Sequence, residues 1–170
     1  MDENLEILEV VNRRNQLVGL ASRGSIHRYG LQHRGVHVLV FDPSGRLYLQ
    51  YRHHRKSQYP RHWDSSAAGH VNPGEDYATA AAREVAEELG LHLELWPVAD
   101  VSAAPETSWE HVRLFQAITA VEPRPNPAEI EAGHFFTPAE LHDLLYRSDA
   151  AVTPSFRLLY RVWQQQGDGG

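Results

Sequence analysis

The chain has 170 residues, with 16 basic and 22 acidic side chains, and 42% of its residues are hydrophobic. This length and balance are typical of one globular domain with a sizeable buried core, and they exclude a disordered chain. The net charge of −6 argues against a broad basic face for nucleic acid, and the absence of cysteine excludes a disulfide scaffold, a thiolate nucleophile and a cysteine-based zinc site.

The beginning of the chain carries acids, Asp2 and Glu3, where a secretory signal would carry basic residues. No apolar stretch reaches the length needed to cross a membrane. We therefore expect a cytoplasmic protein that binds neither a membrane nor nucleic acid.

The first part of the chain is rich in strand signals. Short strands are predicted over residues 7–11 and 17–20, and a clearer hairpin joins residues 36–41 to 47–51 through a turn that contains Asp42, Pro43 and Gly45. Residues 52–63 form a polar, basic and aromatic loop. A short strand is then predicted over 65–71, followed by a turn at 72–74.

The clearest helix signal covers residues 77–89, which contain five alanines, no internal Gly or Pro, and Gly90 just after the last turn. Further strands are predicted over 91–99 and 112–121, with a proline-containing loop over 122–127. Thr137 and Pro138 begin another helix, and a last helix covers 155–164. Because hairpins outnumber βαβ units, we predict an α/β protein of the α+β type with a mixed sheet, in one domain over residues 1–164 with a flexible tail over 165–170.

The predicted helix over 77–89 carries both an apolar stripe and an acidic cluster. The stripe, expected to face the core, contains Ala78, Ala81, Ala82, Val85 and Leu89. Glu84, Glu87 and Glu88 fall on an adjoining arc, where like charges three and four residues apart repel. A site for a hard divalent cation such as Mg²⁺ would explain this arrangement, and a solvated acidic face is the alternative.

The cluster lies within a longer pattern that runs from Gly69 to Leu91. The pattern is Gly, five residues, Glu, seven residues, Arg-Glu, aliphatic, any, Glu-Glu, any, Gly, aliphatic, and every fixed position is present. A chance match in a chain of this length is on the order of one in a million. The segment resembles the Nudix box, and the order of strands and helices around it resembles the Nudix fold, in which the box is a loop–helix–loop.

The resemblance implies a set of site residues. The family's divalent metal, Mg²⁺ or Mn²⁺, would be held by the backbone carbonyl of Gly69 and by Glu84, Glu87 and Glu88. Arg83 would orient these carboxylates, and Glu75 would brace the loop. The implied reaction is hydrolysis of the phosphoanhydride bond of a nucleoside diphosphate linked to another group, or of a related diphosphate compound, by metal-activated water. Either Glu87 or Glu88 could serve as general base.

The loop over 52–63 is basic in an acidic protein. No acid occurs between Asp42 and Asp64, whereas five basic residues do. Arginine suits bidentate contact with phosphate, and lysine serves as a point charge. Beside a diphosphate-handling box we expect Arg52 and Lys56 to contact the substrate, although a loop of this kind can also be simply solvated.

The run from Tyr59 to His70 resembles one Nudix branch, which contains type I isopentenyl-diphosphate isomerases and related hydrolases. In that alignment Arg52 and Lys56 fall on the isomerase's diphosphate contacts. Its metal ligands correspond to His33, His70 and Glu110, with His27 on or next to a fourth and Ser108 in place of a fifth. Ala68 occupies the position of the isomerase's catalytic cysteine, and the isomerase's box is degenerate whereas this one is intact. We therefore expect a hydrolase.

Several choices stay open at this level. The extra carboxylate that Nudix hydrolases place outside the box is Glu110, Glu129 or Glu131, with Glu110 preferred. Trp109 is expected to form a wall of the pocket. A second metal at His27, His33 and His70 is an alternative to a hydrogen-bonding role. The competing functions are isopentenyl-diphosphate isomerase and a non-catalytic diphosphate-binding module, and the expected partners are a small-molecule diphosphate and, as is common in the family, a second copy in a homodimer.

Overall fold

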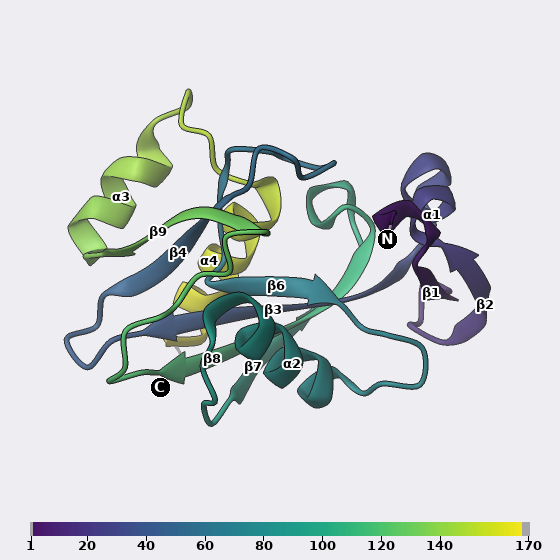
Figure 1. Ribbon diagram of the computed structural model, residues 1–170, viewed down its shortest axis with the longest axis horizontal. Coiled ribbons are helices and arrows are strands. Elements are labelled where there is room, and N and C mark those ends of the chain that lie inside the picture. Colours follow the sequence, from purple (N-terminus) through teal and green to yellow (C-terminus); the bar gives the residue numbers. More distant parts are fainter. Residues whose placement is uncertain (1, 168–170) are drawn as a thin grey trace.

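The computed structural model describes residues 2–167 and is built around a seven-stranded mixed sheet. Five of its strands lie in the order β5-β4-β3-β8-β7, while β6 pairs with β3 and β9 pairs with β4. The strands are β3 (His33–Phe41), β4 (Leu47–Arg52), β5 (Trp63–Asp64), β6 (Ala67–His70), β7 (Trp96–Val101), β8 (Glu110–Ile118) and β9 (Ile130–Phe136). A separate hairpin of β1 (Ile7–Val11) and β2 (Leu17–Ser22) lies at one end, beside helix α1 (Arg23–Tyr29) (Figure 1).

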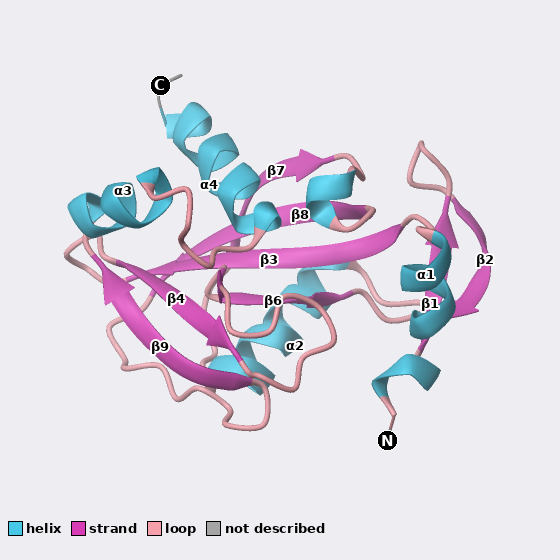
Figure 2. Cartoon of the chain, turned by 90° about the horizontal axis from the view of Figure 1, so that it is seen from above, coloured by secondary structure: helices cyan, strands magenta, loops and turns pink. Residues whose placement is uncertain are grey.

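Helices cover both faces of the large sheet. Helix α2 (Tyr77–Leu89) lies on one face and α4 (Pro154–Gly167) on the other, with α3 (Pro138–Tyr146) near the outer end of β9 (Figure 2). Strand β3 alternates between two cores accordingly. Val36, Val38 and Val40 pack with the α2 side, whereas Leu39 packs with residues of α4. Two short 3₁₀ helices, Glu3–Leu5 and Pro105–Thr107, complete the described structure.

The sheet forks at β3. One edge of β3 pairs in parallel with β8 along its whole length, so that His33 lies opposite Glu110. The other edge is shared, because β6 pairs with residues 35–38 and β4 pairs only with Val40 and Phe41. At the fork the buried Ser66 hydroxyl accepts from the backbone N–H of Val40 at 2.8 Å and donates to the carbonyl of Tyr48. The fork brings β6 and α2 close to the start of β8, where polar residues gather.

The predicted fold class is confirmed, and α2 has the predicted bounds. Its first turn is capped by the Asp76 side chain, which accepts from the backbone N–H of Thr79 at 2.7 Å, and Gly90 ends it with a left-handed φ of 64°. Along the described residues no helix is long and apolar enough to cross a membrane.

Other element predictions need correction. Helix α1 was not predicted, because its seven residues are too few to show a helical period. The strand expected over 65–71 is shorter, since β6 covers only Ala67–His70, and the strand expected over 91–99 begins only at Trp96. Strands β5 and β9 were not predicted. Helix α4 continues to Gly167, so residues 165–167, which we expected in the tail, are helical. The rest of the predicted tail, 168–170, lies outside the described residues.

The predicted core stripe of α2 is wrong in one important respect. Ala78 and Ala82 are exposed, whereas Glu84 and Glu88 are buried with Val85 and Leu89. The alanines of α2 lie on several faces of the helix, and burial of an alanine side chain contributes little free energy. The apolar pattern therefore does not determine which face of the helix packs against the sheet. The helix is turned so that two of its three acids point into the protein.

Candidate active site

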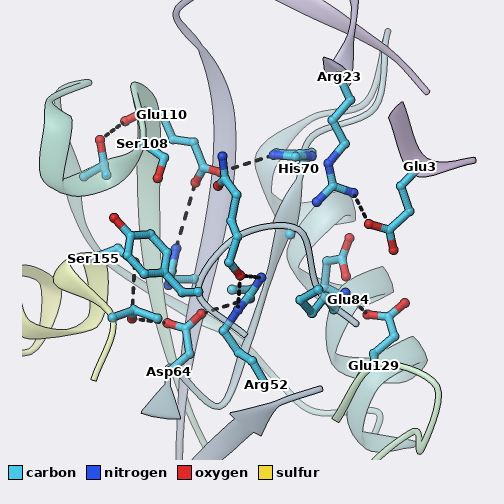
Figure 3. Close-up of a pocket in the computed structure, with 18 of the residues that line it drawn as sticks. Glu3, Arg23, Arg52, Asp64, His70, Glu84, Ser108, Glu110, Glu129 and Ser155 are labelled. Atoms are coloured by element: carbon cyan, nitrogen blue, oxygen red, sulfur yellow. Dashed lines mark hydrogen bonds and ion pairs between the residues drawn. The ribbon is translucent and has the colours of Figure 1, made fainter. Parts of the chain in front are cut away.

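A pocket of about 280 Å³ opens between α2, the loop after β4, the 3₁₀ helix Pro105–Thr107 and the N-terminal segment. Charged and hydrogen-bonding side chains line almost all of it, as Figure 3 shows. The apolar lining is limited to Ala68, Gly69 and the ring of Tyr59. Such a wall suits a polar ligand better than a hydrocarbon. Because acidic side chains outnumber basic ones in the lining, an anionic ligand would need a cation beside it.

The three glutamates of α2 do not share one environment. Glu84 and Glu88 are 8% and 2% exposed, whereas the Glu87 side chain is 53% exposed at the rim of the pocket. Glu84 lies directly against the backbone of β6, since a Cβ on Gly69 would be 2.1 Å from its carboxyl carbon. Only glycine therefore lets this carboxylate approach the backbone of Gly69 so closely.

Arg83 joins the loop before α2 to the carboxylates. Its Nε and Nη2 donate to both oxygens of Glu75, each at 2.9 Å, and Nη2 also donates to the carbonyl of His70 at 2.9 Å. Its Nη1 donates to Glu84 at 2.7 Å and lies 3.4 Å from Glu87. These contacts raise the pKa of Arg83 above its ordinary value, so the guanidinium is permanently charged. One guanidinium thus links Glu75 to Glu84, and the orienting and bracing roles of Arg83 and Glu75 stay predictions.

Glu88 is held by two donors from the sheet. Gln50 Nε2 donates to Oε2 at 2.7 Å, and the backbone N–H of Ala68 donates to Oε1 at 3.1 Å. Sequence reasoning missed Gln50, which is 1% exposed. A signal was present: alternation along β4 places Gln50 on the same face as Tyr48, which packs in the core beside α2.

The environments of the buried acids Glu84 and Glu88 favour a bound cation. Burial raises the pKa of Glu84 to about 7, with further repulsion from Glu87 and Glu129, although Arg83 opposes the shift. Burial together with repulsion from Glu84 and Glu129 raises the pKa of Glu88 well above its ordinary value. Clustered carboxylate oxygens are the ligands that Mg²⁺ and Mn²⁺ prefer, so these residues fit such an ion.

Two of the five basic residues of the loop region line the pocket. Arg52 donates through Nε and Nη2 to the carbonyl of Gln58, at 3.1 and 3.0 Å, and through Nη1 to Asp64 at 3.3 Å. Lys56 Nζ lies 3.3 Å from Glu129 Oε2. The other three, Arg46, Arg55 and Arg61, are exposed outside the pocket lining. Arg52 and Lys56 therefore line the pocket, and their contact with phosphate stays a prediction.

A second polar cluster forms where β3, β6 and β8 meet. His33 Nε2 lies 3.6 Å and His70 Nε2 3.3 Å from Glu110 Oε1, and one ligand atom from each of the three residues lies within 4.8 Å of the others. Glu110 can approach β3 because a Cβ on Gly35 would be 2.2 Å from its Oε2. Burial would raise the pKa of Glu110, but the two neighbouring imidazoles hold it well below its ordinary value.

The tautomer of His33 makes this cluster a candidate metal centre. Its Nδ1 lies 2.9 Å from the carbonyl of Leu31, and because a carbonyl only accepts, Nδ1 must carry a proton. In the neutral ring Nε2 then carries a lone pair, which faces the Glu110 carboxylate. This Nε2 is buried without a hydrogen-bond partner. Two acceptors facing each other fit a cation between them, with the Leu31 carbonyl orienting the ligand.

His27 stands beside this cluster. Its ring centroid is 5.7 Å from those of His33 and His70, and its Nε2 is also buried without a partner. Burial and the two neighbouring imidazoles lower the pKa of His27 to about 4. The side-chain amide of Gln58 lies 2.7 Å from its Nδ1 and so links the basic loop to α1.

The positions of the candidate extra carboxylates and of Trp109 can now be compared with the predictions. Glu110 and Glu129 line the pocket, whereas Glu131 lies outside the pocket lining, beside His54 and Arg61. Trp109 does not line the pocket, so that prediction was wrong; its indole lies against Gly30, where a Cβ would be 3.2 Å from Nε1. The aromatic residue in the lining is Tyr59.

The comparisons with known proteins agree with this geometry. The model of the NUDIX domain family matches residues 31–156. An isopentenyl-diphosphate Delta-isomerase of Nocardia farcinica is 36% identical over 156 residues, which cover 86% of this chain and 88% of the relative. A protein of Streptomyces coelicolor named as an uncharacterized Nudix hydrolase is 36% identical over 146 residues, covering 82% and 79%. A solved structure from Deinococcus radiodurans has a TM-score of 0.81 at 29% identity, covering 93% of this chain and 99% of that one.

Proposed function

The chain belongs to the Nudix family, and from that premise we propose that it is a hydrolase dependent on Mg²⁺ or Mn²⁺. Its substrate would be a nucleoside diphosphate linked to another group, or a related diphosphate compound, cleaved at the phosphoanhydride bond. One observation supports the proposal: the complete box is folded so that Arg83 contacts Glu84 at the wall of a polar pocket, while Glu88 is buried between α2 and the sheet.

Each site residue has a task in this reaction. Glu84, Glu87, Glu88 and the carbonyl of Gly69 would hold the metal, which when bound neutralises the diphosphate and activates water. Arg83 keeps the carboxylates aligned. Lys56, now 3.3 Å from Glu129, would exchange that partner for a phosphate oxygen, and the remaining N–H groups of Arg52 would donate to the same group.

The isomerase reading draws support from the name of the Nocardia relative and from the cluster of His33, His70 and Glu110. Two features argue against it. Ala68 lines the pocket where the cysteine is expected, and the chain has no cysteine to replace it. The polar walls would also have to be desolvated by a prenyl tail without compensating hydrogen bonds. A non-catalytic binding module is disfavoured because every box glutamate is present.

A substrate panel tests the proposal. Purified protein is incubated with nucleoside di- and triphosphates, nucleotide sugars, coenzyme diphosphates and isopentenyl diphosphate, with Mg²⁺ or Mn²⁺, in ¹⁸O-labelled water. We expect products labelled on one phosphate, formed only with metal and observed by mass spectrometry. Glu87→Gln and Glu88→Gln should each lower kcat, and the variant that loses about 10²–10⁴-fold without losing metal identifies the general base.

The same panel separates the alternatives. Deuterium uptake into isopentenyl diphosphate without hydrolysis would establish the isomerase. Tight binding with no turnover across the panel would establish the binding module. Full hydrolytic activity in Glu88→Gln would refute the assignment of the box as the active site.

A further inference from the structure

The carboxylate of Glu88 is fixed by the sheet rather than by its own helix. Glu88 is 2% exposed, and each of its oxygens accepts one hydrogen bond from the sheet region: Oε2 from Gln50 at 2.7 Å and Oε1 from the backbone of Ala68 at 3.1 Å. No basic side chain contacts it among the ion pairs of the described residues. Glu84, by contrast, is held by Arg83.

Gln50 reaches Glu88 because of the fork in the sheet. Beyond Tyr48, β4 no longer pairs with β3, and Gln50 lies opposite Asp64 of β5 and Gly133 of β9. Its side chain therefore points across the gap toward β6 and α2. There its Nε2 donates both to Glu88 and, at 3.3 Å, to the carbonyl of Ser66.

The chemistry of the partners determines the orientation of the amide. The Ser66 carbonyl and the Glu88 carboxylate are both acceptors, so the NH₂ group must face them. Both protons of that group are used, one on each partner. A methionine would fill the same space without a donor, and a glutamate would put an acceptor against two acceptors.

We propose that Gln50 is a positioning residue for the reaction, which holds the Glu88 carboxylate in place for the divalent metal. The inference rests on the proposed function and extends it to a residue outside the box. Loss of a hydrogen bond to a metal-ligating carboxylate lowers metal affinity or activity about 10- to 100-fold in other proteins.

The test compares Gln50→Met and Gln50→Glu with wild type. Binding of Mn²⁺ alone is followed by electron paramagnetic resonance without substrate, and kcat and KM are measured at saturating metal. We expect Mn²⁺ affinity to fall about 10-fold or more, and kcat to fall with little change in KM. Gln116→Met is the matched control, since Gln116 accepts one hydrogen bond from Trp163 at 2.8 Å on another strand, away from the pocket.

A double-mutant cycle separates positioning from general stability. In a Glu88→Gln background, Gln50→Met should have no further effect on Mn²⁺ affinity if it acts through Glu88. Wild-type affinity in both folded Gln50 variants would overturn the proposal, and so would loss of the fold in both, which would assign Gln50 to stability. Either result leaves the hydrolysis by the wild-type protein standing, whereas the absence of any hydrolysis by the wild-type protein would refute the proposed function itself.

Discussion

At the scale of single residues, two glycines decide where acids can lie. Because Gly69 has no side chain, Glu84 can approach the backbone of β6, and Gly35 in the same way lets Glu110 approach the backbone of β3. In each case a Cβ would lie within 2.2 Å of a carboxylate atom, far inside van der Waals contact. The absence of a side chain is therefore what brings each carboxylate close to the strand.

We predict that Gly69→Ala abolishes the metal site while the protein still folds. The added methyl group must displace Glu84, which rotates away from Arg83, and overpacking of this kind costs about 1–3 kcal/mol. Calorimetry should show Mn²⁺ affinity reduced at least tenfold. Gly19→Ala is the control, because nothing lies within 4 Å of a Cβ there; unchanged binding in Gly69→Ala would contradict the role of this glycine.

At the scale of elements, the site is assembled from separate pieces of chain. Strand β3 supplies His33, β6 supplies Gly69 and His70, β8 supplies Glu110, and α2 supplies Glu84, Glu87 and Glu88. The parallel register of β3 and β8 places His33 opposite Glu110, and the antiparallel β6 returns His70 to the same end of the sheet. The loop after β4 then adds its cations from the side.

The histidine cluster should hold a metal of its own. We predict that purified wild-type protein retains a transition metal, measured by inductively coupled plasma mass spectrometry, and that His33→Ala loses it because the buried Nε2 ligand is removed. His134→Ala, which alters an exposed histidine on β9, should keep the metal. Equal metal content in all three proteins would show that this cluster is not a metal site.

The basic loop should act on substrate affinity. Lys56→Met is predicted to raise KM about tenfold with little change in kcat, since one charge-assisted hydrogen bond to phosphate is lost. Arg55→Met alters an exposed neighbour on the same loop, outside the pocket, and should leave KM unchanged. If kcat alone falls in Lys56→Met, the lysine acts on the chemical step and not on binding.

At the scale of the whole molecule, the buried ionisable groups make stability depend on pH. The pKa of Glu84 rises from 4.5 to about 7 on folding, so its contribution to stability is present below pH 4.5 and is lost as pH rises through 7. The pKa of His27 falls from 6.5 to about 4, so its contribution has the opposite sign and is complete above pH 6.5. Above pH 6.5 the glutamates therefore determine the trend.

We predict that the metal-free protein loses stability between pH 6.5 and about 8, by roughly 1 kcal/mol from Glu84, with a further loss from Glu88 in the same direction. Saturating Mg²⁺ should remove this decline, because the ion stabilises the charged carboxylates. Urea unfolding between pH 6.5 and about 8, once with a chelator and once with Mg²⁺, measures the free energy of unfolding in the two states. Glu84→Gln should flatten the metal-free curve, and a stability that rises with pH in the absence of metal would contradict the assigned shifts.

The sequence by itself determined the complete pattern of the box, the bounds of α2 and the class of the fold. Spacing along one helix and the caps at Asp76 and Gly90 are local properties, so they can be read from neighbouring residues. Only the tertiary structure decided that Glu84 and Glu88 are buried, that Gln50 holds Glu88 and that Trp109 lies outside the pocket. The first two facts depend on the rotation of α2 and on the fork at β3, and the third on the contact of Trp109 with Gly30. All three are set by packing between residues far apart in the chain.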